Sequence, residues 1–112
     1  MRLFLIAAAL VGLALPAQAQ QVASGTITTI RTGWNDDSFG VVITAEQINP
    51  AGCTENAQGY ISMITQPGYH TYYAAALTAY VARKPVTVTV HNTECLGPSS
   101  GSFPKIIGIS MP

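Results

Sequence analysis

Five short segments of the chain have the residue pattern of β-strands, and in residues 86–91 valine alternates strictly with polar residues. These segments are residues 25–34, 39–47, 59–65, 86–91 and 105–111. They are rich in threonine, valine and isoleucine, which favour strands. Asn and Asp at 35–38 form a typical turn sequence, so residues 25–47 are predicted to form a hairpin. Longer loops are predicted at 48–58 and 96–104, where Pro and Gly are present.

One further segment has the period of an α-helix. An apolar stripe predicts a helix from Tyr69 to Ala82 that faces the core through Tyr73, Ala76, Leu77, Tyr80 and Val81. Pro85 cannot continue that helix. The order β-β-β-α-β-β predicts a mainly β fold with one helix, an OB-fold-like five-stranded barrel. An α+β sandwich is the alternative for the same order of elements.

The opposite side of the predicted helix carries no charge. It consists of Ala74, Ala75, Thr78, Ala79 and Ala82, where a surface helix normally carries charged side chains. Alanine is the best helix former, so intrinsic propensity is one interpretation. The other is that small residues pack against a second copy or a partner. The second interpretation predicts an oligomer interface at Ala75, Thr78, Ala79 and Ala82.

The first 19 residues have the pattern of a cleaved signal peptide. Arg2 precedes an apolar run, Pro16 interrupts that run, and Ala17-Gln18-Ala19 is a typical cleavage site. The run is shorter than the about 20 residues that span a membrane, which disfavours the alternative of an anchor. We therefore expect a secreted or periplasmic protein without a membrane span, consisting of a single domain over residues 20–112.

The low charge and the two cysteines of the chain limit the classes of function that are expected. Charged residues make up 9% of the chain, and beyond residue 19 four basic side chains accompany five acidic ones. A protein that tracks phosphates needs a basic surface, so nucleic-acid binding is not expected. Both cysteines of an exported chain are predicted to form one disulfide, Cys53–Cys95. Two distant cysteines and two scattered histidines lack the spacing of a metal site.

No catalytic constellation is present in the sequence, and no cofactor is expected. Asp36 and Asp37 are explained by their turn, and neither His70 nor His91 has a nucleophile beside it in the sequence. A small hydrolase therefore remains the least supported function class. Trp34 beside the two carboxylates could instead hold a sugar by stacking and hydrogen bonds, although aromatic residues more often bury area.

The hairpin TITTIRTGWNDDSFGVVIT and the helix that is followed, after Lys84-Pro85, by VTVTV resemble exported B subunits of bacterial AB-type toxins. The branch with the subtilase cytotoxin and pertussis-like B subunits is the most similar. The resemblance spans about residues 25–111 and implies an OB-fold whose helices line the pore of a pentamer. It also implies a host glycan as ligand and an A-type subunit as partner. Ser24 lies near the place of the serine in that family's sialic-acid site, although the segment ahead of it is shorter here.

These observations together predict an exported, non-enzymatic and oligomeric binding module that recognises a glycan. The expected ligand surface comprises Ser24, Trp34, Asp36, Asp37 and Tyr69. The alternative is a periplasmic structural or protein-interaction protein that has no small ligand.

Overall fold

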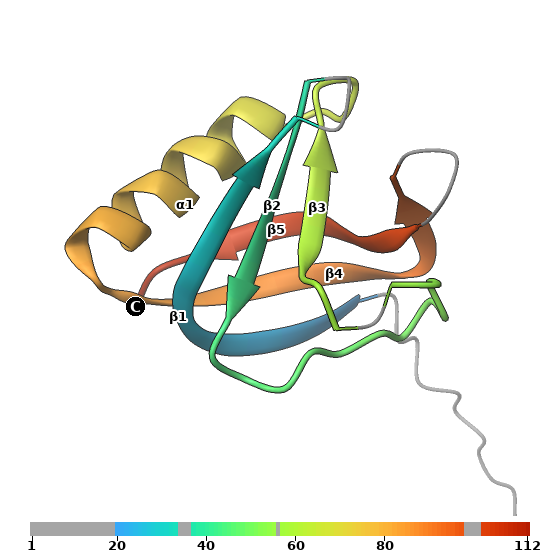
Figure 1. The fold of residues 1–112 in the computed structure, drawn as a ribbon, viewed down its shortest axis with the longest axis horizontal. Coiled ribbons are helices and arrows are strands. Elements are labelled where there is room, and N and C mark those ends of the chain that lie inside the picture. Colours follow the sequence, from blue (N-terminus) through green and yellow to red (C-terminus); the bar gives the residue numbers. More distant parts are fainter. Residues whose placement is uncertain (1–19, 34–36, 56, 98–101) are drawn as a thin grey trace, which may run out of the picture.

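The computed structural model describes residues 20–33, 37–55, 57–97 and 102–112. The predicted signal peptide, Trp34 and Asp36 lie outside the described residues. The elements are β1 (Gln20–Thr32), β2 (Ser38–Ile43), β3 (Tyr60–Met63), α1 (Tyr69–Ala82), β4 (Pro85–Leu96) and β5 (Phe103–Ser110). The predicted order of elements, with one helix between the third and fourth strands, is confirmed (Figure 1).

The five strands form a ring in the order β1-β2-β3-β5-β4. All neighbours are antiparallel except β3 and β5, which run parallel and pair at Ile61 and Lys105. A glutamine side chain joins the same two strands. Gln66 accepts a hydrogen bond from the Ser62 hydroxyl at 2.7 Å and donates one to the carbonyl of Ile106. Side-chain bonds therefore supplement a short backbone ladder at this point of the ring.

Strand β1 connects two sides of the ring because it changes partner along its length. Residues 20–26 pair with β4, whereas residues from Ile27 onward pair with β2. Gly25 lies just before this change of partner, where β1 approaches the segment after β2. A Cβ atom there would lie 2.8 Å from the Thr44 hydroxyl oxygen and 2.9 Å from the Ala45 nitrogen. A side chain would therefore prevent the close approach of the two segments.

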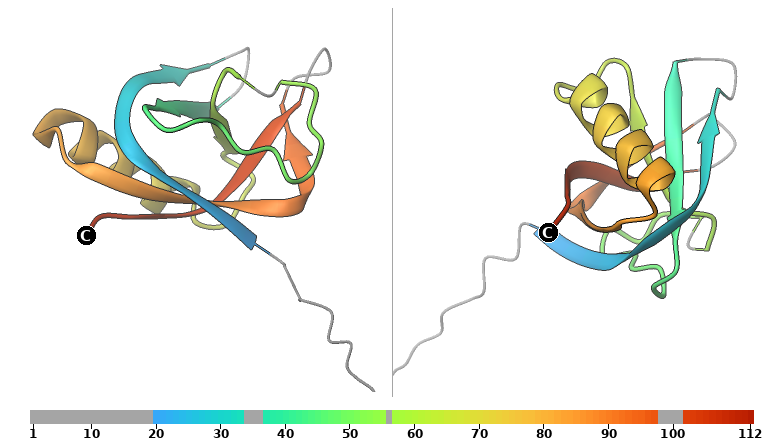
Figure 2. Two further views of the ribbon diagram at one scale, coloured as in Figure 1. Left: turned by 90° about the horizontal axis from the view of Figure 1, so that it is seen from below. Right: turned by 90° about the vertical axis from the view of Figure 1, so that its left-hand side faces the viewer.

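The core follows the predicted alternation of the strands. Val86, Val88 and Val90 on β4 are fully buried, as their period of two predicted. They pack with Phe39, Val41 and Ile43 from β2, Tyr60 from β3 and Ile106 from β5. Figures 1 and 2 show α1 lying along one side of the strands, where Ala76 and Ala79 complete this core.

The helix has the predicted bounds, and Tyr73 and Ala76 of the predicted apolar stripe pack against the core, but the buried face is rotated away from the other three residues of that stripe. Tyr69, Ala76 and Ala79 face the core, whereas Leu77, Tyr80 and Val81 are exposed by 38%, 39% and 78%. Two kinds of contact hold the observed rotation. Phe39 packs against the rings of Tyr69 and Tyr73 at centroid distances of 5.6 and 5.0 Å. The Tyr72 hydroxyl donates to the carbonyl of Ile107 at 2.9 Å.

Several strand boundaries also differ from the prediction, and the largest differences are at the start of β1 and at the ends of β2 and β4. Strand β1 begins at Gln20 instead of residue 25, because pairing with β4 extends it. Strand β2 ends at Ile43 instead of residue 47, because the following residues use side chains for other bonds. Thr44 accepts a hydrogen bond from the Thr26 amide through its hydroxyl, and Gln47 binds the backbone of Gly59. Alternation alone does not reveal these side-chain bonds.

Candidate functional site

The most exposed apolar surface of α1 is the candidate functional site. We name it the outer face of α1 and define it as Ala74, Leu77, Thr78, Tyr80 and Val81, all of which are exposed. Leu77 and Val81 lie four residues apart and therefore point the same way. The helix contains no acidic or basic residue other than His70. An exposed helix surface without charge is unusual for a protein surface in contact with water alone.

The predicted oligomer interface overlaps this face only in part. Thr78 and Ala82 are exposed and Ala75 is half-buried. The Thr78 hydroxyl donates to the carbonyl of Ala74 at 2.8 Å, so its methyl group remains for packing. The assignment of Ala79 to a surface that meets a partner is wrong, because Ala79 has no exposed area and packs within its own chain. Leu77, Tyr80 and Val81 were not predicted as surface residues, because the predicted stripe placed them in the core.

The predicted ligand residues are spread over the molecule. Ser24 lies on the exposed side of β1, and its hydroxyl is 2.9 Å from that of Thr87 on β4. Asp37 is exposed in the connection between β1 and β2, and its carbonyl accepts from the Ile64 amide at 2.8 Å. Tyr69 is buried at the start of α1.

These positions do not form one pocket in the described part of the chain. Ser24 lies in the half of β1 that pairs with β4, whereas Asp37 follows the far end of the same strand (Figure 1). Tyr69 contributes its ring to the core beside Phe39 and Tyr73 instead of presenting it to a ligand. Trp34 and Asp36, which were predicted beside Asp37, lie outside the described residues, so the sugar platform stays a prediction.

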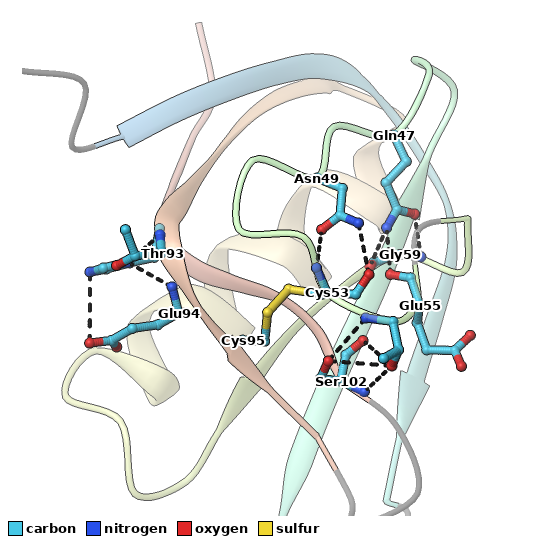
Figure 3. The surroundings of a disulfide bond; sticks show 11 residues. Gln47, Asn49, Cys53, Glu55, Gly59, Thr93, Glu94, Cys95 and Ser102 are labelled. Carbon is cyan, nitrogen blue, oxygen red and sulfur yellow. Dashed lines mark hydrogen bonds and ion pairs between the residues drawn. A yellow bond between two sulfur atoms is a disulfide. The ribbon is translucent and has the colours of Figure 1, made fainter. Parts of the chain in front are cut away.

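The disulfide is surrounded by hydrogen bonds between side chains and backbone (Figure 3). The predicted bond between Cys53 and Cys95 is confirmed and joins the loop before β3 to the end of β4. Asn49 bonds the backbone of Cys53 twice, through its amide nitrogen and its oxygen, at 2.8 Å each. Thr54 and Ser102 exchange backbone and hydroxyl hydrogen bonds beside it, including the Ser102 amide to the Thr54 hydroxyl at 2.8 Å. The loop is thereby fixed to the end of β4 and to the residue that precedes β5.

A histidine turn shapes β4 just before the disulfide. The Nδ1 atom of His91 accepts hydrogen bonds from the amides of Thr93 and Glu94, both at 3.1 Å. This acceptor role places the ring proton on Nε2 in the neutral form. Glu94 accepts a hydrogen bond from Lys105 at 2.7 Å, and this bond is the main cause that lowers the pKa of Glu94. The arrangement is explained by the local backbone and needs no catalytic role.

No group of three or more His, Cys, Asp and Glu side chains gathers for a metal ion within the described segments. No helix among those segments is long and apolar enough to cross a membrane. No protein-family model matches the chain, and no curated protein matches it either.

Proposed function

We propose that this protein is an exported, non-enzymatic binding module of the OB-fold type that assembles with copies of itself through the outer face of α1. In this proposal it resembles the B subunits of AB-type toxins, and the assembled ring presents a surface for a glycan. An A-type subunit is the partner that the resemblance implies.

The strand arrangement supports the OB-fold assignment. Five strands in a ring, with one helix between the third and fourth, follow the order expected for that barrel. The parallel pairing of β3 with β5 closes the ring between the two halves of the chain. A fold of this kind is shared by proteins of unrelated function, so the functional proposal needs a separate observation.

The observation that carries the proposal is the uncharged outer face of α1. Val81 is 78% exposed, and Leu77 and Tyr80 project from the same helix. Transfer of apolar area out of water contributes about 25 cal/mol per Å2, so contact with a second copy would stabilise these side chains. Neighbouring copies would also meet no charge repulsion along the helix, because His70 is its one titratable basic residue.

Native mass spectrometry of the oxidised protein tests self-assembly. We expect a closed oligomer for the unmodified chain and a monomer for the Val81→Glu variant, because a charge at the interface requires desolvation. Val22→Glu is the matched control: Val22 is 58% exposed but lies on β1 and is not part of the outer face of α1. A monomeric unmodified protein across the micromolar range would refute the self-assembly.

Glycan binding is tested separately on the purified protein. A glycan array followed by titration should show a ligand whose affinity falls in Asp37→Ala or Ser24→Ala, since both positions are exposed. The absence of binding on the array and in the titration would refute the proposed glycan recognition, but it would not affect the proposed self-assembly. A monomer without a glycan ligand would favour the alternative, a periplasmic structural or protein-interaction protein.

A further inference from the structure

A cavity lies beside the end of β2, and none of its lining residues belongs to α1. Its volume is about 310 Å3, and it is lined by Val42, Ile43, Ala45, Glu46, Gln47, Ala57 and Tyr60. Sites for small ligands have volumes of ~300–1,000 Å3 and mostly apolar walls with a few polar groups. The cavity has a volume at the small end of this range, and its lining combines apolar side chains with the polar groups of Glu46, Gln47 and Tyr60.

The walls of the cavity are held in place without a ligand. Gln47 accepts a hydrogen bond from the Gly59 amide at 2.6 Å and donates to the carbonyls of Gly59 and Glu55 at 3.0 and 3.4 Å. The Cys53–Cys95 disulfide anchors the same loop to β4. A preformed site loses little conformational freedom on binding, which favours affinity.

Glu46 supplies an available negative charge. It is the one lining residue that carries a charge at neutral pH, and it is exposed at the cavity. Among the described residues its carboxylate makes no hydrogen bond or ion pair. A carboxylate beside apolar walls favours a ligand that has a cationic group on an aliphatic stem.

Tyr60 is a further polar residue of the cavity lining. Its side chain is buried, and its phenol oxygen accepts from the Ile48 amide at 2.9 Å. Burial raises the pKa of this phenol, so it keeps its proton at neutral pH. Within the described part of the chain that proton has no acceptor. Because a buried donor without an acceptor is unfavourable, a ligand with a carbonyl oxygen would complete the site.

We propose that this cavity binds an alkylammonium group with a nearby carbonyl, the chemistry of a lysine side chain in a peptide. Glu46 pairs with the ammonium, the apolar walls contact the aliphatic stem, and the Tyr60 hydroxyl donates to the carbonyl. The cavity belongs to a single chain, so the proposal does not rest on self-assembly or on glycan binding. A monomeric protein without a glycan ligand would still bind the lysine group.

The test is a titration of the 15N-labelled protein with Nα-acetyl-lysine methylamide, followed by amide chemical shifts. We expect saturable shifts at the cavity residues and a dissociation constant on the order of 1 mM, as befits a small ligand. Nα-acetyl-norleucine methylamide has nearly the same shape without the charge and should bind about two- to fivefold more weakly. Pentylamine, which lacks the carbonyl, should also bind more weakly.

Two variants separate the site from the general surface potential. Glu46→Gln should weaken lysine binding about two- to fivefold, whereas Asp37→Asn removes an exposed carboxylate outside the cavity lining and should leave it unchanged. Equal binding of the norleucine compound, equal weakening in both variants, or no saturable shift would overturn the proposal. Equal binding of pentylamine would overturn the role of Tyr60.

Discussion

Because of the rotation of α1, the same substitution should lower the stability of the protein by very different amounts at two nearby positions. Ala79 has no exposed area, whereas Val81, two residues further along the helix, is 78% exposed. A glutamate at position 79 must enter the core between the helix and the strands. A glutamate at position 81 points into solvent or towards a second copy. Ala79→Glu and Val81→Glu therefore test directly which side of the helix is buried.

The expected losses in the free energy of unfolding at positions 79 and 81 differ enough to be measured. At position 79 the added side chain overpacks the core at about 1–3 kcal/mol. A buried polar group without a partner costs a further ~1–3 kcal/mol, and an ionised one costs more. Together these costs are about 2–6 kcal/mol for a neutral side chain and more for an ionised one, against a stability of roughly 5–10 kcal/mol for a small domain. At position 81 an acidic group in the last turn costs ~0.3–1 kcal/mol through the helix dipole.

Urea denaturation followed by far-UV circular dichroism measures both variants. Ala79→Val serves as a graded change, because it adds volume without charge and is expected to cost about 1–3 kcal/mol while the protein stays folded. Native mass is recorded for each sample, since association raises the apparent stability. A loss of stability at position 81 equal to or greater than that at position 79 would refute the rotation described above.

Three further predictions concern the rest of the molecule. Replacement of Cys53 and Cys95 by alanine should lower the free energy of unfolding by about 4 kcal/mol, the value of the chain-entropy model for a separation of 42 residues. Urea titration measures this loss, and an unchanged unfolding midpoint would contradict it. Gly59→Ala should lower the free energy of unfolding by about 3 kcal/mol, because φ of Gly59 is +111° and a Cβ there would lie 2.4 Å from the Val41 carbonyl oxygen on β2. A thermal midpoint equal to that of the parent would disprove this. The hydrogen bond from Lys105 lowers the pKa of Glu94, so its stabilisation is present above the unfolded pKa and is lost as pH falls through the folded one. Stability of Glu94→Gln and of the parent should accordingly converge in acid, and a constant difference across pH would exclude the effect.

The candidate sites show where sequence reasoning reached its limit. An uncharged helix surface was predicted, and the outer face of α1 is uncharged, but three of its residues were expected in the core. The cavity was not predicted, because its lining comes from the end of β2, the following loop and the start of β3. No local pattern links Glu46 to Tyr60, since their relative position depends on the pairing of β2 with β3, in which Val41 lies opposite Tyr60.

The sequence by itself determined the strands, the helix and the disulfide. Val86, Val88 and Val90 alternate with threonines, and that period of two specifies which side of β4 is buried. Pro85 ends the helix, and Cys53 and Cys95 are the two cysteines available for a bond. These signals are local or unique, so they needed no knowledge of the tertiary contacts.

Only the tertiary structure decided the rotation of α1. The helix is apolar on nearly every side, so two stripes of similar spacing were available and no charge distinguished them. Two sets of contacts determine which stripe is buried. The Tyr72 hydroxyl donates to the carbonyl of Ile107 on β5, and Phe39 on β2 packs against the rings of Tyr69 and Tyr73. Contacts between residues more than 25 positions apart in the chain fixed the buried face, and Leu77 and Val81 were left exposed as a consequence.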